Sequence, residues 1–268
     1  MILSIKAISL KCLAKELNSM EFVVNEVKHV ENLLKDKKVT PRKVMKELRL
    51  IVQYYLSKGY TKEETVELTV QFMNDVNGNS SGEKWRKRIE STTNDIISKQ
   101  DYELRDIEEI HITNSELEVI KTLSSELEQK YAFGLLVYCK IWNYKKQGKF
   151  VRIESTTNFA KNVEVNAKAK DRELLFNRLQ EKGLINVPRK TGSDSIEVLY
   201  VNYTDEVGIT IPLEDIDKFI YYYYQWSKKG KIKRCEVCGE LILTTSNRSK
   251  YCKPCAKATN IKKTNEKK

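Results

Sequence analysis

Apolar residues recur at helical spacing through the first hundred positions of the chain. They follow three- and four-residue intervals between Glu21 and Leu34, which predicts an amphipathic helix. Two later positions have the residues of a helix N-terminus. Thr40 is a candidate N-cap before Pro41, and Thr61 precedes Glu64 by three residues in the pattern of a capping box. Further helices are therefore predicted over residues 40–59, 61–73 and 85–99. The pattern indicates an all-helical N-terminal domain.

Helix and strand periodicities alternate in the middle of the chain. Helices are predicted over residues 116–127 and 131–144, the second apolar on nearly every side. The next segments predict a strand at 150–153, helices at 155–163 and 167–182, and strands at 184–187 and 196–201. Gly183 is expected to end the last of these helices. Helix, strand, helix, turn, helix and hairpin is the order of a winged helix-turn-helix.

A winged helix suggests where DNA would be contacted. Its second helix braces the third, whose first turn can enter the major groove, and the hairpin can reach phosphates or the minor groove. The candidate DNA-binding residues of this region are Asn166, Lys168, Lys170, Arg172, Arg189 and Lys190. Winged helices also serve as protein-contact modules, so a purely structural use of this one stays open.

An acidic segment and an aromatic run follow the middle region. Asp215 and Asp217 have no companion typical of a metal-dependent nuclease, and we expect them to form a solvated acidic face. Residues 219–226 read FIYYYYQW. Consecutive helical residues cannot share one face, so core packing is favoured over base stacking by these tyrosines.

Two Cys-x-x-Cys pairs stand near the C-terminus, in CEVCGELILTTSNRSKYCKPC. Cys235, Cys238, Cys252 and Cys255 have the spacing of a closed, four-thiolate structural zinc site of treble-clef or ribbon type. The second pair is expected at a helix start. One Zn²⁺ could contribute on the order of 10 kcal/mol to a module with so few apolar residues. The alternatives are two disulfides or a redox-active Cys-x-x-Cys pair. The sequence has no secretion signal that would favour disulfides.

Positive charge concentrates around these cysteines. Residues 226–268 hold 13 Lys and Arg against 3 Glu, whereas residues 1–225 hold 35 basic and 34 acidic side chains. Such a balance attracts a polyanion and makes binding salt-dependent. Nucleic acid, most simply double-stranded DNA, is the expected partner, with RNA open. Residues 262–268 alone read as a solubilising tail.

The remaining chain offers little for catalysis or for membranes. His29 and His111 are the two histidines and are expected on the surface. No phosphate-binding Gly-rich loop or His-Glu-x-x-His motif occurs, and no apolar run is long enough to span a bilayer. We expect a cytoplasmic protein that is not an enzyme, although a nuclease assembled from distant residues stays open.

Three stretches resemble known protein families, and two of these families belong to mobile elements. SKGYTKEETVELTVQFM with EKWRKRIESTTNDI is similar to the helical domain at the C-terminal end of some phage and plasmid primases, and the end of the predicted helix at Gly183 resembles that of many winged-helix DNA-binding proteins. CGELILTTSNRSKYCKPCA resembles the C-terminal cysteine module of phage, prophage and plasmid proteins of Gram-positive bacteria that also have a winged-helix region. This resemblance implies zinc on the four cysteines, basic positions at Arg248 and Lys250, and a DNA transaction.

The expected fold is mainly α, with a winged helix and a zinc module. We place the helical domain at 20–103, the winged-helix domain with its flanking helices at 104–225, and the basic, four-cysteine zinc finger at 226–268. Residues 1–19 fit poorly with the helical domain, and translation is expected to start at Met20. The expected function is replication initiation or an accessory role in it, with host or phage replication proteins as further partners. Transcriptional regulation and a protein-interaction adaptor are the alternatives.

Overall fold

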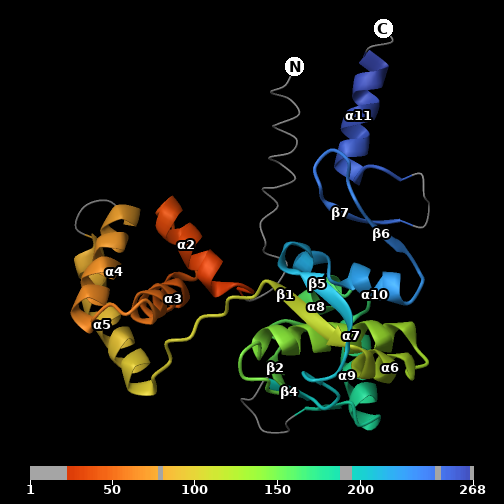
Figure 1. The fold of residues 1–268 in the computed structure, drawn as a ribbon, viewed down its shortest axis with the longest axis horizontal. Coiled ribbons are helices and arrows are strands. Elements are labelled where there is room, and N and C mark those ends of the chain that lie inside the picture. The colour runs from red at the N-terminus through yellow and green to blue at the C-terminus, as the bar shows by residue number, and fades with distance from the viewer. Residues whose placement is uncertain (1–22, 78–80, 188–194, 245–248, 266–268) are drawn as a thin grey trace. The chain divides into compact units, whose positions relative to one another are not determined.

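The computed structural model describes residues 23–77, 81–187, 195–244 and 249–265. Met20 and the segment before it lie outside these ranges. The described chain is mainly helical with small antiparallel sheets, as predicted. It divides into two compact units, one over residues 23–108 and one whose described part begins at Glu109 (Figure 1).

The first unit is built of helices α2 Glu26–Asp36, α3 Val44–Ser57, α4 Lys62–Asn77 and α5 Ser81–Lys99. The predicted capping box is confirmed: the Glu64 N–H donates to Thr61 Oγ1 at 3.2 Å and the Thr61 N–H donates to the Glu64 carboxylate at 2.8 Å. The predicted start of α3 at Thr40 is wrong by several residues. Residues 41–43 form a turn, and the Thr40 N–H instead donates to the Glu47 carboxylate.

The boundary between the units falls at 108/109, five residues after the expected one. Residues 104–108 lack regular structure yet belong with the helical unit through hydrogen bonds to the start of α2. The Asn25 side chain donates to the Ile107 carbonyl at 2.9 Å, and Arg105 pairs with Glu26. Because these side chains stand some eighty positions apart in the sequence, local periodicity did not reveal the connection.

The second unit begins with a strand and two helices. These are β1 Glu109–Thr113, α6 Asn114–Lys121 and α7 Glu126–Trp142. Thr113 caps α6 in a full capping box with Glu116. The single helix predicted over 116–127 is wrong, because α6 ends at Lys121 and α7 starts afresh after its N-cap, Ser125.

A three-stranded sheet and two short helices come next. The elements are β2 Phe150–Arg152, α8 Thr156–Asn162, α9 Ala169–Glu181, β3 Ile185–Asn186 and β4 Ser195–Val198. The sheet has the order β2-β4-β3 and is antiparallel throughout. Gly183 has φ +69° and stands at the end of α9 as predicted. All the segments expected between residues 150 and 201 are therefore present, with shorter strands.

The chain then returns to β1 and leads into the cysteines. The elements are β5 Val207–Pro212, the 3₁₀ helix η1 Leu213–Lys218, α10 Ile220–Trp226, β6 Lys231–Arg234, β7 Leu241–Thr244 and α11 Lys253–Asn265. β5 pairs antiparallel with β1, and β6 pairs antiparallel with β7. No helix in the described part of the chain is both long and apolar enough to cross a membrane.

Helix α7 is the centre of the second unit. Every residue from Lys130 to Ile141 is buried. On one side the Tyr131 ring meets Phe159 of α8 edge-on at 5.2 Å, and on another Phe133 packs against Tyr223 of α10. The expectation that the aromatic run packs into the core is confirmed, since none of its four tyrosines is exposed.

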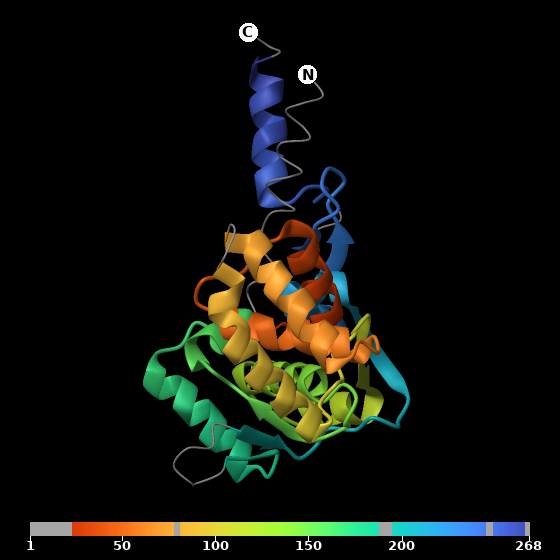
Figure 2. The ribbon, with the colours of Figure 1, turned by 90° about the vertical axis from the view of Figure 1, so that its left-hand side faces the viewer.

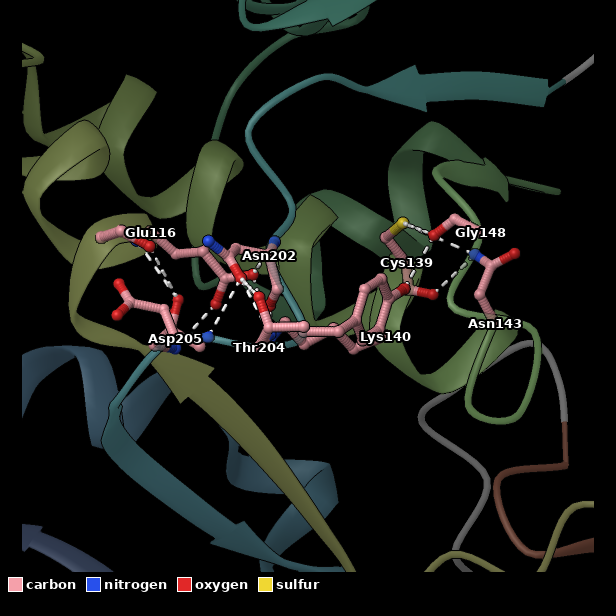
Figure 3. Close-up of polar contacts among 11 residues, drawn as sticks. Glu116, Cys139, Lys140, Asn143, Gly148, Asn202, Thr204 and Asp205 are labelled. Carbon is pink, nitrogen blue, oxygen red and sulfur yellow. Dashed lines mark hydrogen bonds and ion pairs between the residues drawn. The ribbon is translucent and has the colours of Figure 1, made fainter.

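A buried ion pair ties the segment after β4 to α6 and α7. The Glu116 carboxylate lies 2.9 Å from Lys140 Nζ, and both side chains are buried. Glu116 also accepts the Asn202 N–H at 2.6 Å, while Lys140 Nζ donates to the Asn202 carbonyl at 2.7 Å (Figure 3). Burial lowers the pKa of Lys140, and the charge and hydrogen bond of Glu116 oppose that shift. The pair thereby fixes the path of the chain from β4 to β5.

Removing Glu116 should destabilise the second unit strongly. Glu116→Ala leaves the buried Lys140 ammonium without a counter-ion, at a cost of about 3–5 kcal/mol. Urea unfolding followed by tryptophan fluorescence measures this in a Trp85→Phe background, where the signal comes from the second unit alone. The matched control is Glu118→Ala, which removes an exposed pair with Lys121 and should cost less than about 1 kcal/mol. Equal losses in the two variants would contradict the role given to Glu116.

Candidate metal centre

The four predicted ligands come together in the structure. The sulfur atoms of Cys235, Cys238, Cys252 and Cys255 all lie within 4.8 Å of one another. Four sulfurs arranged tetrahedrally around Zn²⁺ at about 2.3 Å stand roughly 3.8 Å apart, and the Cys238 and Cys252 sulfurs are 3.6 Å apart. This separation is far longer than a disulfide bond. Among the described residues, no other group of His, Cys, Asp or Glu side chains is placed to hold a metal ion.

Local structure explains how each pair of cysteines is presented. Cys235 follows the last residue of β6, and the chain turns through Gly239, which has φ +72° and donates its N–H to the Cys235 carbonyl. Cys252 directly precedes α11 and Cys255 lies in its first turn, as predicted. The Cys235 N–H donates to the Glu240 carbonyl at 2.9 Å, which joins the two strands beyond their ladder. Figures 1 and 2 show α11 leading away from the β6–β7 hairpin.

The surroundings of the sulfurs favour a bound cation. Burial would raise the pKa of Cys235, but backbone N–H groups of Cys252, Cys238 and Val237 donate to its sulfur and lower the pKa to about 6. Burial and the neighbouring sulfurs raise the pKa of Cys238 to about 12 and also raise that of Cys255. Crowded thiols of this kind release their protons when a divalent cation neutralises the accumulated charge. The donor set therefore fits a structural metal site with no open position for substrate.

The apolar support of the site is small. Ile242 and Tyr251 pack against the cysteines, and Leu241 is buried. Val237, between the first two cysteines, is exposed and adds nothing to this core. So few buried apolar side chains contribute little to stability, so the module depends on its docking contacts and on the metal ion that its cysteines could hold.

Ion pairs dock this module onto η1 and α10. The Arg234 guanidinium donates to both carboxylate oxygens of Asp215 at 2.7 and 2.8 Å, and Tyr222 donates to the same carboxylate at 2.6 Å. Lys218 donates to the Leu241 carbonyl and pairs with Glu240. The expectation of a solvated acidic face at Asp215 is wrong: its side chain is 1% exposed.

The residues predicted to contact DNA are only partly described. Asn166, Lys168 and Lys170 are exposed at the start of α9, and Lys168 is its N-cap residue. Lys250 is exposed and lies 3.3 Å from the Glu236 carboxylate. Arg189, Lys190 and Arg248 lie outside the described residues.

Arg172 has a different setting from its predicted neighbours. It is half-buried, and its terminal nitrogens donate to the Ala167 carbonyl at 2.7 Å and to Thr157 Oγ1 at 2.9 Å. These bonds hold the turn between α8 and α9 on the rim of an open hollow of about 390 Å³. Arg172 thus shapes the start of α9.

His111 is exposed on β1, as expected, whereas His29 is half-buried beside the buried Glu47.

We expect the purified protein to contain one zinc per chain. Cys252→Ser and Cys255→Ser should each lower the metal content well below one, because each removes a thiolate from a closed site. Atomic absorption measures the content. Cys139→Ala, which alters a buried thiol in α7, is the matched control and should retain the metal. A metal-free wild-type protein with intact amide protection in β6 and β7 would contradict the assignment.

Asp215→Asn should loosen the cysteine module without removing its metal. The variant replaces a bidentate ion pair with a weaker hydrogen bond, and because Arg234 stays half-exposed we expect a cost of about 1–2 kcal/mol. Hydrogen exchange measured by mass spectrometry should show faster exchange in residues 231–244. Glu214→Gln, which alters one exposed contact of the same arginine, should leave exchange nearly unchanged. Similar exchange in both variants would exclude the proposed docking role.

Comparisons of the chain with protein-family models, with curated proteins and with solved structures find no match.

Proposed function

We propose that the chain is a DNA-binding protein in which α7 to β4 form a winged helix that meets duplex DNA. The observation that carries the proposal is the order of these elements together with the sheet order β2-β4-β3. In a winged helix the first strand pairs with the third, the third pairs with the second, and the last helix is the one that enters the major groove. The corresponding helix here is α9.

The exposed start of α9 supports this use. Asn166, Lys168 and Lys170 are exposed, and no side chain caps the helix. Backbone N–H groups of a first turn favour a phosphate, and lysines beside them add charge. Arg172 contributes by fixing the turn rather than by reaching outwards.

The basic cysteine module would supply sequence-independent grip. Residues 226–268 carry a balance of 13 basic to 3 acidic side chains, and two thiolate charges in excess of Zn²⁺ still leave the module strongly positive. Contacts to phosphates give affinity that falls steeply with salt, whereas contacts to bases in the groove give sequence preference. We propose that α9 reads DNA and the module holds the backbone, as in a mobile-element replication initiator or its accessory protein. The cysteine-module resemblance favours the mobile element, and footprinting at an origin rather than a promoter would distinguish replication from transcriptional control.

A protein-contact role for the same helix is the second candidate. The described surface of α9 carries acidic as well as basic side chains, with Asp171 and Glu173 exposed, and Leu174 is 41% exposed. An exposed leucine with charges of both signs around it is compatible with the apolar centre and polar rim of a small protein interface. An adaptor with this face would bind a replication protein and need no DNA.

Lys168→Ala with Lys170→Ala should weaken duplex binding. Fluorescence anisotropy with a labelled duplex from the natural genetic context, measured at several salt concentrations, should show lower affinity and a salt slope reduced by about 2. Lys62→Ala with Lys87→Ala removes the same charge from the exposed surface of the helical unit and serves as the control. No binding of wild-type protein at low salt would favour the adaptor, and equal effects of the two pairs would contradict a DNA-reading role of α9.

A further inference from the structure

The loop that joins α7 to β2 combines exposed rings with unopposed positive charge. Residues 142–150 contain Trp142, Tyr144, Lys145, Lys146, Lys149 and Phe150, and no Asp or Glu. All six side chains are exposed, Phe150 to 52% and Tyr144 to 39%. We call this segment the aromatic-lysine loop. Large rings at the surface are costly in water, and their grouping beside lysines indicates a binding surface.

Hydrogen bonds from two half-buried side chains hold the backbone of this loop. The Asn143 side chain donates to the Cys139 carbonyl at 2.8 Å and to the Phe150 carbonyl at 2.7 Å, which brings the two ends together. Tyr203 donates its hydroxyl to the Gly148 carbonyl at 2.7 Å.

The close packing of Gly148 restricts the loop further. A Cβ at Gly148 would stand 2.4 Å from Asn143 Oδ1, so a larger residue would displace the Asn143 amide that joins the two ends of the loop. A loop braced in this way loses little conformational entropy when it binds a ligand. The structure therefore presents its rings and lysines in a prepared arrangement.

The aromatic-lysine loop and the connection between β3 and β4 lie at opposite ends of the three-stranded sheet. Arg152 pairs with Ser195, where β4 begins, whereas Phe150 pairs with Glu197 further along β4. The loop precedes Phe150 and so lies at the opposite end of the strand. Glu197 is the acidic side chain nearest in register, and its carboxylate accepts a hydrogen bond from Asn186 at 3.3 Å.

We propose that the aromatic-lysine loop binds single-stranded nucleic acid, with bases stacked on Tyr144 and Phe150 and phosphates beside the lysines. In a duplex the base faces are covered by neighbouring bases, so exposed rings can stack only on an open strand. Lysines supply the sequence-independent attraction to the backbone. An acidic protein would satisfy the lysines but would need an apolar patch of matching shape to cover the rings, whereas every base of an open strand offers a flat face. This activity goes beyond the proposed duplex binding and uses different residues.

Single-tryptophan fluorescence of the full zinc-loaded chain tests the proposal. In a Trp85→Phe, Trp226→Phe background only Trp142 reports, and a 20-nucleotide oligo-dT or oligo-U should quench it saturably. Adding Tyr144→Ala with Phe150→Ala should weaken this binding about 10-fold or more. Tyr144→Phe with Phe150→Tyr keeps both rings and should bind like the background protein. The two oligonucleotides distinguish DNA from RNA as the natural strand.

Lysine variants and a duplex-binding measurement distinguish the aromatic-lysine loop from the duplex-binding site proposed at α9. Lys145→Ala, Lys146→Ala and Lys149→Ala together should lower the salt slope for oligo-dT by about 2. Lys62→Ala, Lys84→Ala and Lys87→Ala remove the same charge elsewhere and should not. Duplex affinity should stay within about twofold in the loop variants, whereas Lys168→Ala with Lys170→Ala should spare oligo-dT binding.

Several results would overturn the proposal. They are an absence of quenching by both oligonucleotides, unchanged affinity after loss of both rings, and an equal fall in single-strand and duplex affinity. Displacement of oligo-dT by polyglutamate at equal charge concentration, with no effect of the ring substitutions, would likewise overturn it and identify an acidic protein surface as the occupant.

Discussion

The complete burial of α7 is the constraint on which the second unit depends. A helix that is apolar on all sides must be covered on all sides, and α8, α9, β1, β2 and α10 each pack against it. Its two ends therefore determine where the candidate sites are attached. Near its start, Gln129 accepts the Tyr223 hydroxyl of α10, and Lys229 pairs with Glu126, so the approach to the cysteine module is anchored there. Past its end, Asn143 anchors the aromatic-lysine loop.

The buried charges around α7 define the chain path more than they increase stability. Taking a carboxylate and an ammonium out of water costs several kcal/mol, which their attraction repays only when other hydrogen bonds are complete. Glu116 meets this condition, since it accepts the N–H groups of Thr113 and Asn202 as well as Lys140. An apolar pair of equal volume could pack there, but it would not select this one position for the segment leaving β4. The ion pair thus specifies how β5 returns to β1.

Local patterns predicted the elements well and long-range contacts poorly. The capping box at Thr61, and the order of helices and strands after residue 150, could be read because their signals lie within a few residues of each other. The metal ligands were equally local, as two Cys-x-x-Cys pairs. The burial of Asp215 depends on Arg234, nineteen positions away, and the inward use of Arg172 depends on the fold of a turn. Neither contact can be predicted from sequence spacing, so the sequence alone places Asp215 and Arg172 on the surface.

The cysteine module and its docking contacts depend on each other energetically. With few buried apolar side chains, the module depends on the contacts of Arg234 and Lys218 with the rest of the unit, and a metal ion on its cysteines would add to this order. A metal ion on the four cysteines would fix the β6–β7 hairpin, at whose first strand Arg234 lies within reach of Asp215. Docking in turn limits the orientations open to the basic surface. Without both interactions, the same positive charge would attract a polyanion from any direction, and it would not hold a strand in register with α9.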